Sequence, residues 1–160
     1  MALRNIVYSD NPMIRKKSRF VENFDENLWE LLDDMYETMK KNDGCGIAAP
    51  QVGVLKQVVI IETDGLKLEL INPKIVSSSG SQESIEGCLS VKNLRGLVLR
   101  PKKITCEFYT RHGDLVTMTV QDFLATVFCH EIDHLSGVLY IDKARELYKT
   151  EQEILNKNRK

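Results

Sequence analysis

Apolar residues recur along the chain with two different periods, and each period predicts a different kind of element. After Asp25, leucine and methionine recur at three- and four-residue spacing, as on one face of an amphipathic helix. The spaced residues are Leu28, Leu31, Leu32, Met35 and Met39. Asp25 is a candidate N-cap and Gly44 lies just beyond the end, so the pattern predicts an N-terminal amphipathic helix over residues 26–41.

Short runs rich in β-branched residues follow and predict antiparallel hairpins. The run over residues 58–61 is joined to the run over 66–71 by a turn containing glycine, and the runs over 104–109 and 115–120 flank His112 and a second glycine turn. Two hairpins are therefore expected. His112 itself is interpreted as a solvated turn residue.

The segment between these hairpins contains many turn residues. Residues 77–81 and 87–96 resemble loops, and Pro101 limits any central strand nearby. We expect this half of the sheet to be irregular.

Helical spacing returns at Asp122 and ends near Gly137, which predicts a second, largely apolar helix. Residues 143–160 alternate in charge and have helical propensity, so they are expected to form a polar C-terminal surface helix or tail. The order helix, strands, helix predicts an α+β fold, and the absence of repeats and linkers predicts a single domain over residues 1–160.

Composition narrows the class of protein. The formal net charge of -1 leaves no basic field for DNA or general nucleic-acid binding. No run reaches the length of a membrane span, and the first ten residues lack the apolar core of a signal peptide, so a cytosolic protein is expected. In a reducing compartment the four cysteines are expected to be free thiols or metal ligands.

The strongest chemical signal is a His-Glu-x-x-His motif at residues 130–134, on the predicted second helix. Two histidines four residues apart on a helix lie on the same face, so His130 and His134 can bind one ion. Glu131 lies beside that ion, where it can act as general base on a bound water.

A catalytic site of this kind usually has a third protein ligand and one open position. The longer protease motif would place a histidine at position 140, where this chain has Tyr140, so that branch is disfavoured. Glu151 or Glu153 could supply a carboxylate from the polar tail. We favour the thiolate of Cys88, which lies in a loop-like segment beside Gly87. Cys106 and Cys129 are expected in the core.

Three segments together resemble the signature motifs of the peptide deformylase family. They are Gly44 to Gln51 (GCGIAAPQ), Glu86 to Ser90 (EGCLS) and His130 to His134 (HEIDH), in the order found in that family. The resemblance implies antiparallel β-sheets around a central helix that carries the metal-binding histidines. Two positions depart from the family pattern, Cys45 and Lys92, and the first concerns the wall of the methionine pocket.

The resemblance also implies an activity and a cofactor. The expected reaction removes the N-formyl group from the N-terminal methionine of newly synthesised proteins and releases formate. The implied ligands are Cys88, His130 and His134, and the implied ion is Fe(II), with Zn(II), Ni(II) or Co(II) as substitutes. A hydroxide on this ion would attack the formyl carbon with Glu131 as general acid and base. The Gln51 amide and the Leu89 backbone N–H would stabilise the developing charge.

Substrate binding is expected to resemble the addition of a strand, with the N-formylmethionyl nascent chain pairing along Gly46 and the loop after Cys88. An apolar pocket near Cys45, Phe123 and Val127 would select methionine, and Arg95 would meet the later peptide. The full set of predicted substrate-binding residues is Cys45, Gly46, Glu86, Arg95, Phe123 and Val127.

Two other functions remain open on the sequence alone. One is an endopeptidase that uses Glu151 or Glu153 as third ligand, and the other is a non-catalytic metal-binding or nascent-chain-binding module, which the presence of Glu131 disfavours. The basic residues of the C-terminal tail make a transient ribosome contact conceivable, although a solvated helix is the simpler interpretation.

Overall fold

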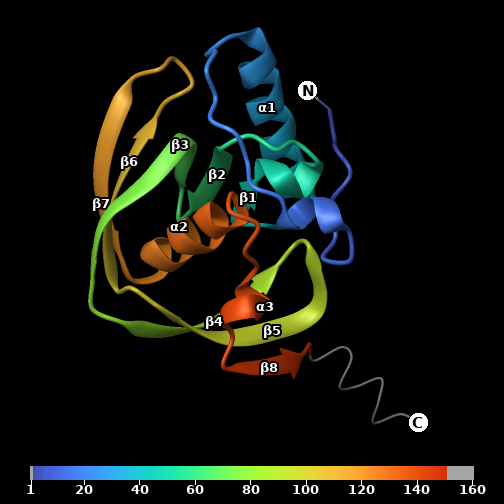
Figure 1. Ribbon diagram of the computed structural model, residues 1–160, viewed down its shortest axis with the longest axis vertical. Helices are drawn as coiled ribbons and strands as arrows, with labels where there is room; N and C mark the ends of the chain where they lie inside the picture. The colour runs from blue at the N-terminus through green and yellow to red at the C-terminus, as the bar shows by residue number, and fades with distance from the viewer. Residues whose placement is uncertain (1, 151–160) are drawn as a thin grey trace.

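Helix α2, Asp122–His134, lies at the centre of the computed structural model, between two antiparallel sheets (Figure 1). The structure describes residues 2–150. The five-stranded sheet has the order β1 (Gly46–Ala48), β2 (Val58–Thr63), β3 (Leu66–Ser79), β6 (Lys103–Tyr109), β7 (Leu115–Gln121). The three-stranded sheet has the order β4 (Gln82–Cys88), β5 (Val91–Arg100), β8 (Glu146–Lys149). The short helices are η1 (Pro12–Arg15), η2 (Ala49–Val52) and α3 (Tyr140–Lys143). This α+β arrangement confirms the predicted fold class.

Helix α1 spans Glu26–Lys41, as the spacing of leucine and methionine predicts. The Asp25 carboxylate accepts a hydrogen bond from the Leu28 backbone N–H at 3.3 Å, which confirms Asp25 as the N-cap. The apolar face of the helix is buried against the five-stranded sheet. Burying this face removes it from water and fixes α1 on the sheet.

Strand β2 is buried on both faces, which explains its uninterrupted run of apolar residues. Val58 and Ile60 pack in the cluster beneath α1, whereas Val59 and Ile61 pack in the cluster around α2. Alternate side chains of a strand point to opposite faces, so one short segment belongs to two cores. The strand thereby couples α1 to the helix that carries the His-Glu-x-x-His motif.

Both predicted hairpins are present. Strand β2 pairs with β3 from Val58 opposite Ile71 to Thr63 opposite Leu66, and β6 pairs with β7 without a register shift. The expectation of loops between them is wrong, because β3 continues to Ser79 and residues 82–88 and 91–100 pair as β4 and β5. The expected irregularity is present as register shifts, within the pairing of β3 with β6 and between Glu86 and Cys88.

Two glycines explain why this region resembled a loop. A Cβ on Gly87 would lie 2.6 Å from the Arg95 Nη1, and a Cβ on Gly96 would lie 2.9 Å from Cε2 of Tyr140. Both glycines lie within strands and allow a neighbouring side chain to approach the backbone closely. Their function is close packing, not chain reversal.

The predicted C-terminal helix is also corrected. Residues 146–149 form β8, which pairs antiparallel with β5 from Leu94 opposite Lys149 to Leu97 opposite Glu146. Hydrogen bonding to the edge of β5 outweighs the helical propensity of this polar segment, because tertiary context overrides a weak local preference. Residues 151–160 lie outside the described residues. Within residues 2–150, no helix is long and apolar enough to cross a bilayer.

Candidate active site

Helix α2 presents both motif histidines on one buried face. His130 and His134 are one turn apart, their ring centroids lie 5.2 Å from each other, and both are largely inaccessible to solvent. Burial lowers the pKa of His134 well below its ordinary value, which keeps this imidazole neutral. A neutral imidazole has a free lone pair for a metal ion.

Cys88 reaches the same place from the end of β4. The pairing of β4 with β5 shifts register between Glu86 and Cys88, and a local irregularity of this kind redirects a side chain. The Cys88 Sγ lies 3.4 Å from Nε2 of His134. One donor atom from each of Cys88, His130 and His134 lies within 4.8 Å of the others.

This donor set fits a divalent transition metal. Catalytic zinc sites take three protein ligands from cysteine, histidine and carboxylate side chains and leave a further coordination position open. The same ligands also suit iron, nickel and cobalt. The three residues proposed as ligands are therefore close enough to bind one ion together, and their chemistry matches it.

Glu131 lies beside this cluster with one oxygen free. Its Oε2 is 3.9 Å from Nε2 of His130, its Oε1 is 3.9 Å from Nε2 of His134, and Oε1 is buried with no hydrogen-bond partner among the described residues. Burial raises the pKa of Glu131 to about 7. A carboxyl group with this pKa can both accept and release a proton near neutral pH.

Gly46 makes room for this carboxylate. A Cβ at position 46 would lie 2.6 Å from Oε2 of Glu131, a separation that real Cβ contacts do not reach. Glycine at this point of β1 therefore permits the edge of the five-stranded sheet to approach the metal-binding motif.

A buried charge network supports the histidine side of the site. The Nδ1 of His130 is 2.9 Å from Oε1 of Glu86, and Arg100 donates to both Glu86 oxygens at 2.8 and 2.9 Å. Arg100 also donates to Asp133 at 2.7 Å. Burial opposes ionisation of Glu86, but the hydrogen bonds from Arg100 and His130 lower its pKa to about 2. The network fixes the ring orientation of His130, as carboxylates commonly do for metal-binding histidines.

The sequence prediction did not include Arg100 or Asp133. Asp133 lies inside the His-Glu-x-x-His motif, and Arg100 is an arginine in a strand that is otherwise mostly apolar at its inward positions. The sequence places Arg100 at a position of the strand where the side chain points inward. A buried charge needs partners, so this position could have indicated a charged network.

Gln51 is held by η2 with its amide group directed at the cluster. Its Oε1 accepts from the Ala48 backbone N–H at 2.9 Å, and its Nε2 lies 3.1 Å from the Ser90 hydroxyl and 3.5 Å from the Cys88 Sγ. Because the oxygen is held by backbone, the N–H groups must face the site.

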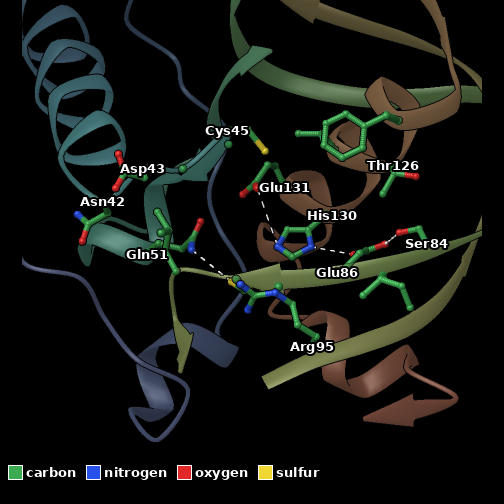
Figure 2. A pocket seen from close by; sticks show the side chains of 18 of the residues that line it. Asn42, Asp43, Cys45, Gln51, Ser84, Glu86, Arg95, Thr126, His130 and Glu131 are labelled. Atoms are coloured by element: carbon green, nitrogen blue, oxygen red, sulfur yellow. Dashed lines mark hydrogen bonds and ion pairs between the residues drawn. The ribbon is translucent and has the colours of Figure 1, made fainter. Parts of the chain in front are cut away.

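A cavity of about 740 Å³ opens beside these groups. Figure 2 shows Cys45, Gln51, Arg95, His130 and Glu131 around it. The cavity brings together every predicted site residue except His134, and Phe123 and Val127 form part of its wall. The wall also contains Ser84 and Thr126, which the sequence prediction omitted. Glu86 lines the cavity as well, although its oxygens already bind Ser84, Arg100 and His130.

The other cysteines and His112 lie where the sequence predicts. Cys106 and Cys129 are buried, and burial raises the pKa of each thiol to about 11, so both remain protonated. Cys45 is an exposed residue that lines the cavity, and its thiol group is partly withdrawn from water, which together with the charge of Glu131 raises its pKa. All four cysteines are free. His112 is exposed in the β6–β7 turn, against Trp29.

Comparison with known proteins agrees with the geometry. The family model described as "Polypeptide deformylase" matches residues 3–150. The chain belongs to the polypeptide deformylase family. It is 49% identical to peptide deformylase 2 of Clostridium acetobutylicum over 150 residues, covering 93% of this chain and 100% of the relative.

Solved structures of the family have the same fold. A peptide deformylase from Legionella pneumophila superposes with a TM-score of 0.87 at 37% identity, covering 99% of this chain and 93% of the other. The enzyme from Thermotoga maritima gives 0.89 at 34% identity, covering 91% of this chain and 100% of the other. The deformylase fold therefore extends over nearly all of the chain.

Proposed function

We propose that this chain is a peptide deformylase, a hydrolase that removes the N-formyl group from the N-terminal methionine of newly synthesised proteins and releases formate. Membership of the family supports the reaction. One observation carries the proposal for this chain: the donors of Cys88, His130 and His134 converge beside the unpartnered oxygen of Glu131.

Cys88, His130 and His134 would hold one divalent ion, and Fe(II) is the ion we expect, with Zn(II), Ni(II) or Co(II) as substitutes. When bound, such an ion polarises a carbonyl oxygen and lowers the pKa of water from about 15.7 to about 7. Glu86 is best placed to orient His130, because Arg100 and His130 already engage its carboxylate. We therefore assign it to positioning the ligand in preference to the substrate contact suggested by sequence.

Glu131 would move the proton. Its free Oε1 accepts a proton from the attacking water and then donates it to the departing amine, so that formate and a free amino terminus are the products. Burial, which raises the pKa of Glu131 in the metal-free chain, favours uptake of that proton. Glu131 lines the cavity, and the absence of a side chain at Gly46 leaves room for its carboxylate.

Gln51 and Leu89 would stabilise the negative charge that develops on the formyl oxygen. The Gln51 Nε2 donor is fixed in advance by the bond from its oxygen to the backbone of Ala48, and preorganised donors are the effective ones. The Leu89 backbone N–H follows Cys88 directly in the chain and is the second proposed donor.

The nascent chain would bind as an added strand beside Gly46 and the segment after Cys88. Its first side chain would enter a pocket lined by Cys45, Phe123 and Val127. Arg95 would contact later residues of the peptide. Arg95 is exposed and lies across Gly87, at the mouth of the cavity.

The cytoplasm is the expected location, because formylated nascent chains are made there. A transient contact between the basic C-terminal tail and the ribosome remains a further prediction. Residues 151–160, which include Glu151 and Glu153, lie outside the described residues.

The decisive assay measures formate release from formyl-Met-Ala-Ser by metal-loaded protein prepared without oxygen. A peptide of this sequence is apt because an Acinetobacter baumannii peptide deformylase has been solved with Met-Ala-Ser bound. We expect formate and peptide with a free amino terminus. Cleavage of an internal amide without formate would support the endopeptidase, and the absence of any turnover would support a binding module.

A further inference from the structure

Thr126 carries a buried hydroxyl group that has no hydrogen-bond partner among the described residues. The residue is 4% exposed and lies on α2, in the wall of the active-site cavity. Buried polar atoms in folded proteins are nearly always paired, and an unpaired one destabilises the fold. Because Thr126 also lines the cavity, a change of its side-chain rotamer can bring this unpaired hydroxyl to a ligand bound there.

The usual intrahelical partner of this hydroxyl is already occupied. A threonine inside a helix commonly donates to the carbonyl four residues earlier, which here belongs to Asp122. The Gln82 side-chain Nε2 donates to that carbonyl at 2.8 Å. In an α-helix the same carbonyl also accepts a hydrogen bond from the backbone N–H of Thr126. Both lone pairs of the Asp122 oxygen are therefore engaged. The carbonyl four residues earlier is therefore not free to accept from Thr126.

Thr126 lies on the same helix and in the same cavity as the proposed reacting centre. It lies one helical turn before His130 on the same face of α2, which separates the two Cβ atoms by about 5–6 Å. Figure 2 shows Thr126 beyond His130 and Glu131, on the same side of the cavity as Ser84. Threonine in a helix adopts two χ1 rotamers, so its hydroxyl can turn toward a ligand without a change in the backbone.

The surrounding wall is less apolar than the pocket that the sequence predicts. Ser84 donates its hydroxyl proton to Oε2 of Glu86 at 2.7 Å, which leaves the oxygen of Ser84 able only to accept. Cys45 contributes a thiol on the opposite side. Two hydroxyl groups, those of Ser84 and Thr126, belong to the cavity wall. Only the hydroxyl of Thr126 still has a proton to donate to a ligand.

We propose that Thr126 is a specificity-determining residue whose hydroxyl group donates a hydrogen bond to an acceptor at the sulfur position of the substrate's first residue. The inference rests on the proposed function. The thioether of methionine is a weak acceptor and the oxygen of methionine sulfoxide is a strong one, whereas norleucine has the same length and no acceptor. The enzyme accordingly also deformylates chains that begin with formylmethionine sulfoxide.

The test compares kcat/KM for three peptides, formyl-Met-Ala-Ser and its norleucine and methionine sulfoxide counterparts, in metal-loaded protein. We expect the wild type to prefer methionine over norleucine by roughly three- to tenfold, because norleucine leaves the hydroxyl unpaired. In Thr126→Val, which keeps the shape and removes the hydroxyl, this ratio falls to about one and the sulfoxide-to-norleucine ratio falls roughly tenfold. Thr126→Ser retains the hydroxyl and is expected to keep both ratios.

Each outcome decides the proposal. Equal use of methionine and norleucine by the wild type, or unchanged ratios in Thr126→Val, would overturn it while leaving the deformylase function intact. Absence of formate from all three peptides would overturn the proposed function and this inference together. If the valine variant does not fold, Thr126→Ala provides the same comparison of ratios.

Discussion

Helix α2 and the β4–β5 hairpin each contribute half of the site, but through different kinds of geometry. The helix places His130, Glu131 and His134 by its own period, so their relation is local. The hairpin places Glu86 and Cys88 across a register shift, and they reach the helix only when the three-stranded sheet packs against it. The comparison shows that one half of a metal site can be determined by sequence spacing while the other half depends on tertiary packing.

Arg100 joins the two halves. From β5 it contacts Glu86 on β4 and Asp133 on α2, and its side chain is almost fully buried. A buried arginine is stable only with its partners in place. The network therefore ties correct packing of the hairpin to correct orientation of His130.

The largest expected effect tests the helix half. Glu131→Gln removes the group proposed to move the proton while keeping its size, so kcat should fall by roughly 10³-fold. Metal content should remain near that of the wild type, because glutamate is not among the proposed ligands. The matched control is Glu30→Gln at an exposed position on α1, away from the cavity. Near-normal kcat in Glu131→Gln would remove Glu131 from the mechanism.

A second prediction tests the hairpin half through its pH dependence. The pKa of Glu86 is about 2 in the folded chain, below its ordinary value of 4.5. A lowered carboxyl pKa contributes stability that is present above pH 4.5 and is lost as the pH falls toward 2. The contribution is on the order of 3 kcal/mol.

Urea unfolding of metal-free protein across this pH range measures that contribution. The free energy of unfolding should fall more steeply with acid in the wild type than in Glu86→Gln, which lacks the titrating group. Parallel pH profiles for the two proteins would contradict the role of the Glu86 network.

The same substitution also tests whether the hairpin half contributes to metal affinity. Glu86→Gln weakens the fixed orientation of His130, and loss of such a supporting contact typically lowers metal affinity by roughly 10–100-fold. Competition with a chelator gives the affinity, again with Glu30→Gln as control. Unchanged affinity would mean that the hairpin positions Cys88 without helping His130.

The smallest effect is expected at His112, the histidine outside both halves. Its contact with Trp29 is an edge-on ring contact on the surface, so His112→Ala should change the free energy of unfolding by about 1 kcal/mol or less. Metal content and activity should match the wild type. A loss of bound metal would place His112 in the ligand set.

The sequence predicted the elements that have a local period and missed those that depend on distant partners. Helix periods and β-branched runs predicted α1, α2 and both hairpins, and the motif predicted the histidine pair. The strands β4, β5 and β8 were missed, because Gly87 and Gly96 serve close packing and residues 146–149 gain a strand partner only in the folded chain. Arg100 was missed for the same reason, since its partners come from two distant elements.

The resemblance to a family supplied what spacing could not. From the residues alone, Cys88 competed with Glu151 and Glu153 as third ligand, and nothing local in the sequence relates position 88 to position 134. The structure brings Cys88 Sγ to 3.4 Å from Nε2 of His134. No sequence period encodes that contact, which depends on the packing of β4 against α2.

The most direct test of the account is metal stoichiometry in Cys88→Ala and in Cys106→Ala, a matched thiol in the core, both purified without oxygen. We predict about one ion per chain in the wild type and in Cys106→Ala, and little metal and little formate release in Cys88→Ala. Full metal content with full activity in Cys88→Ala would contradict the convergence of sulfur and imidazole on which the proposed chemistry depends.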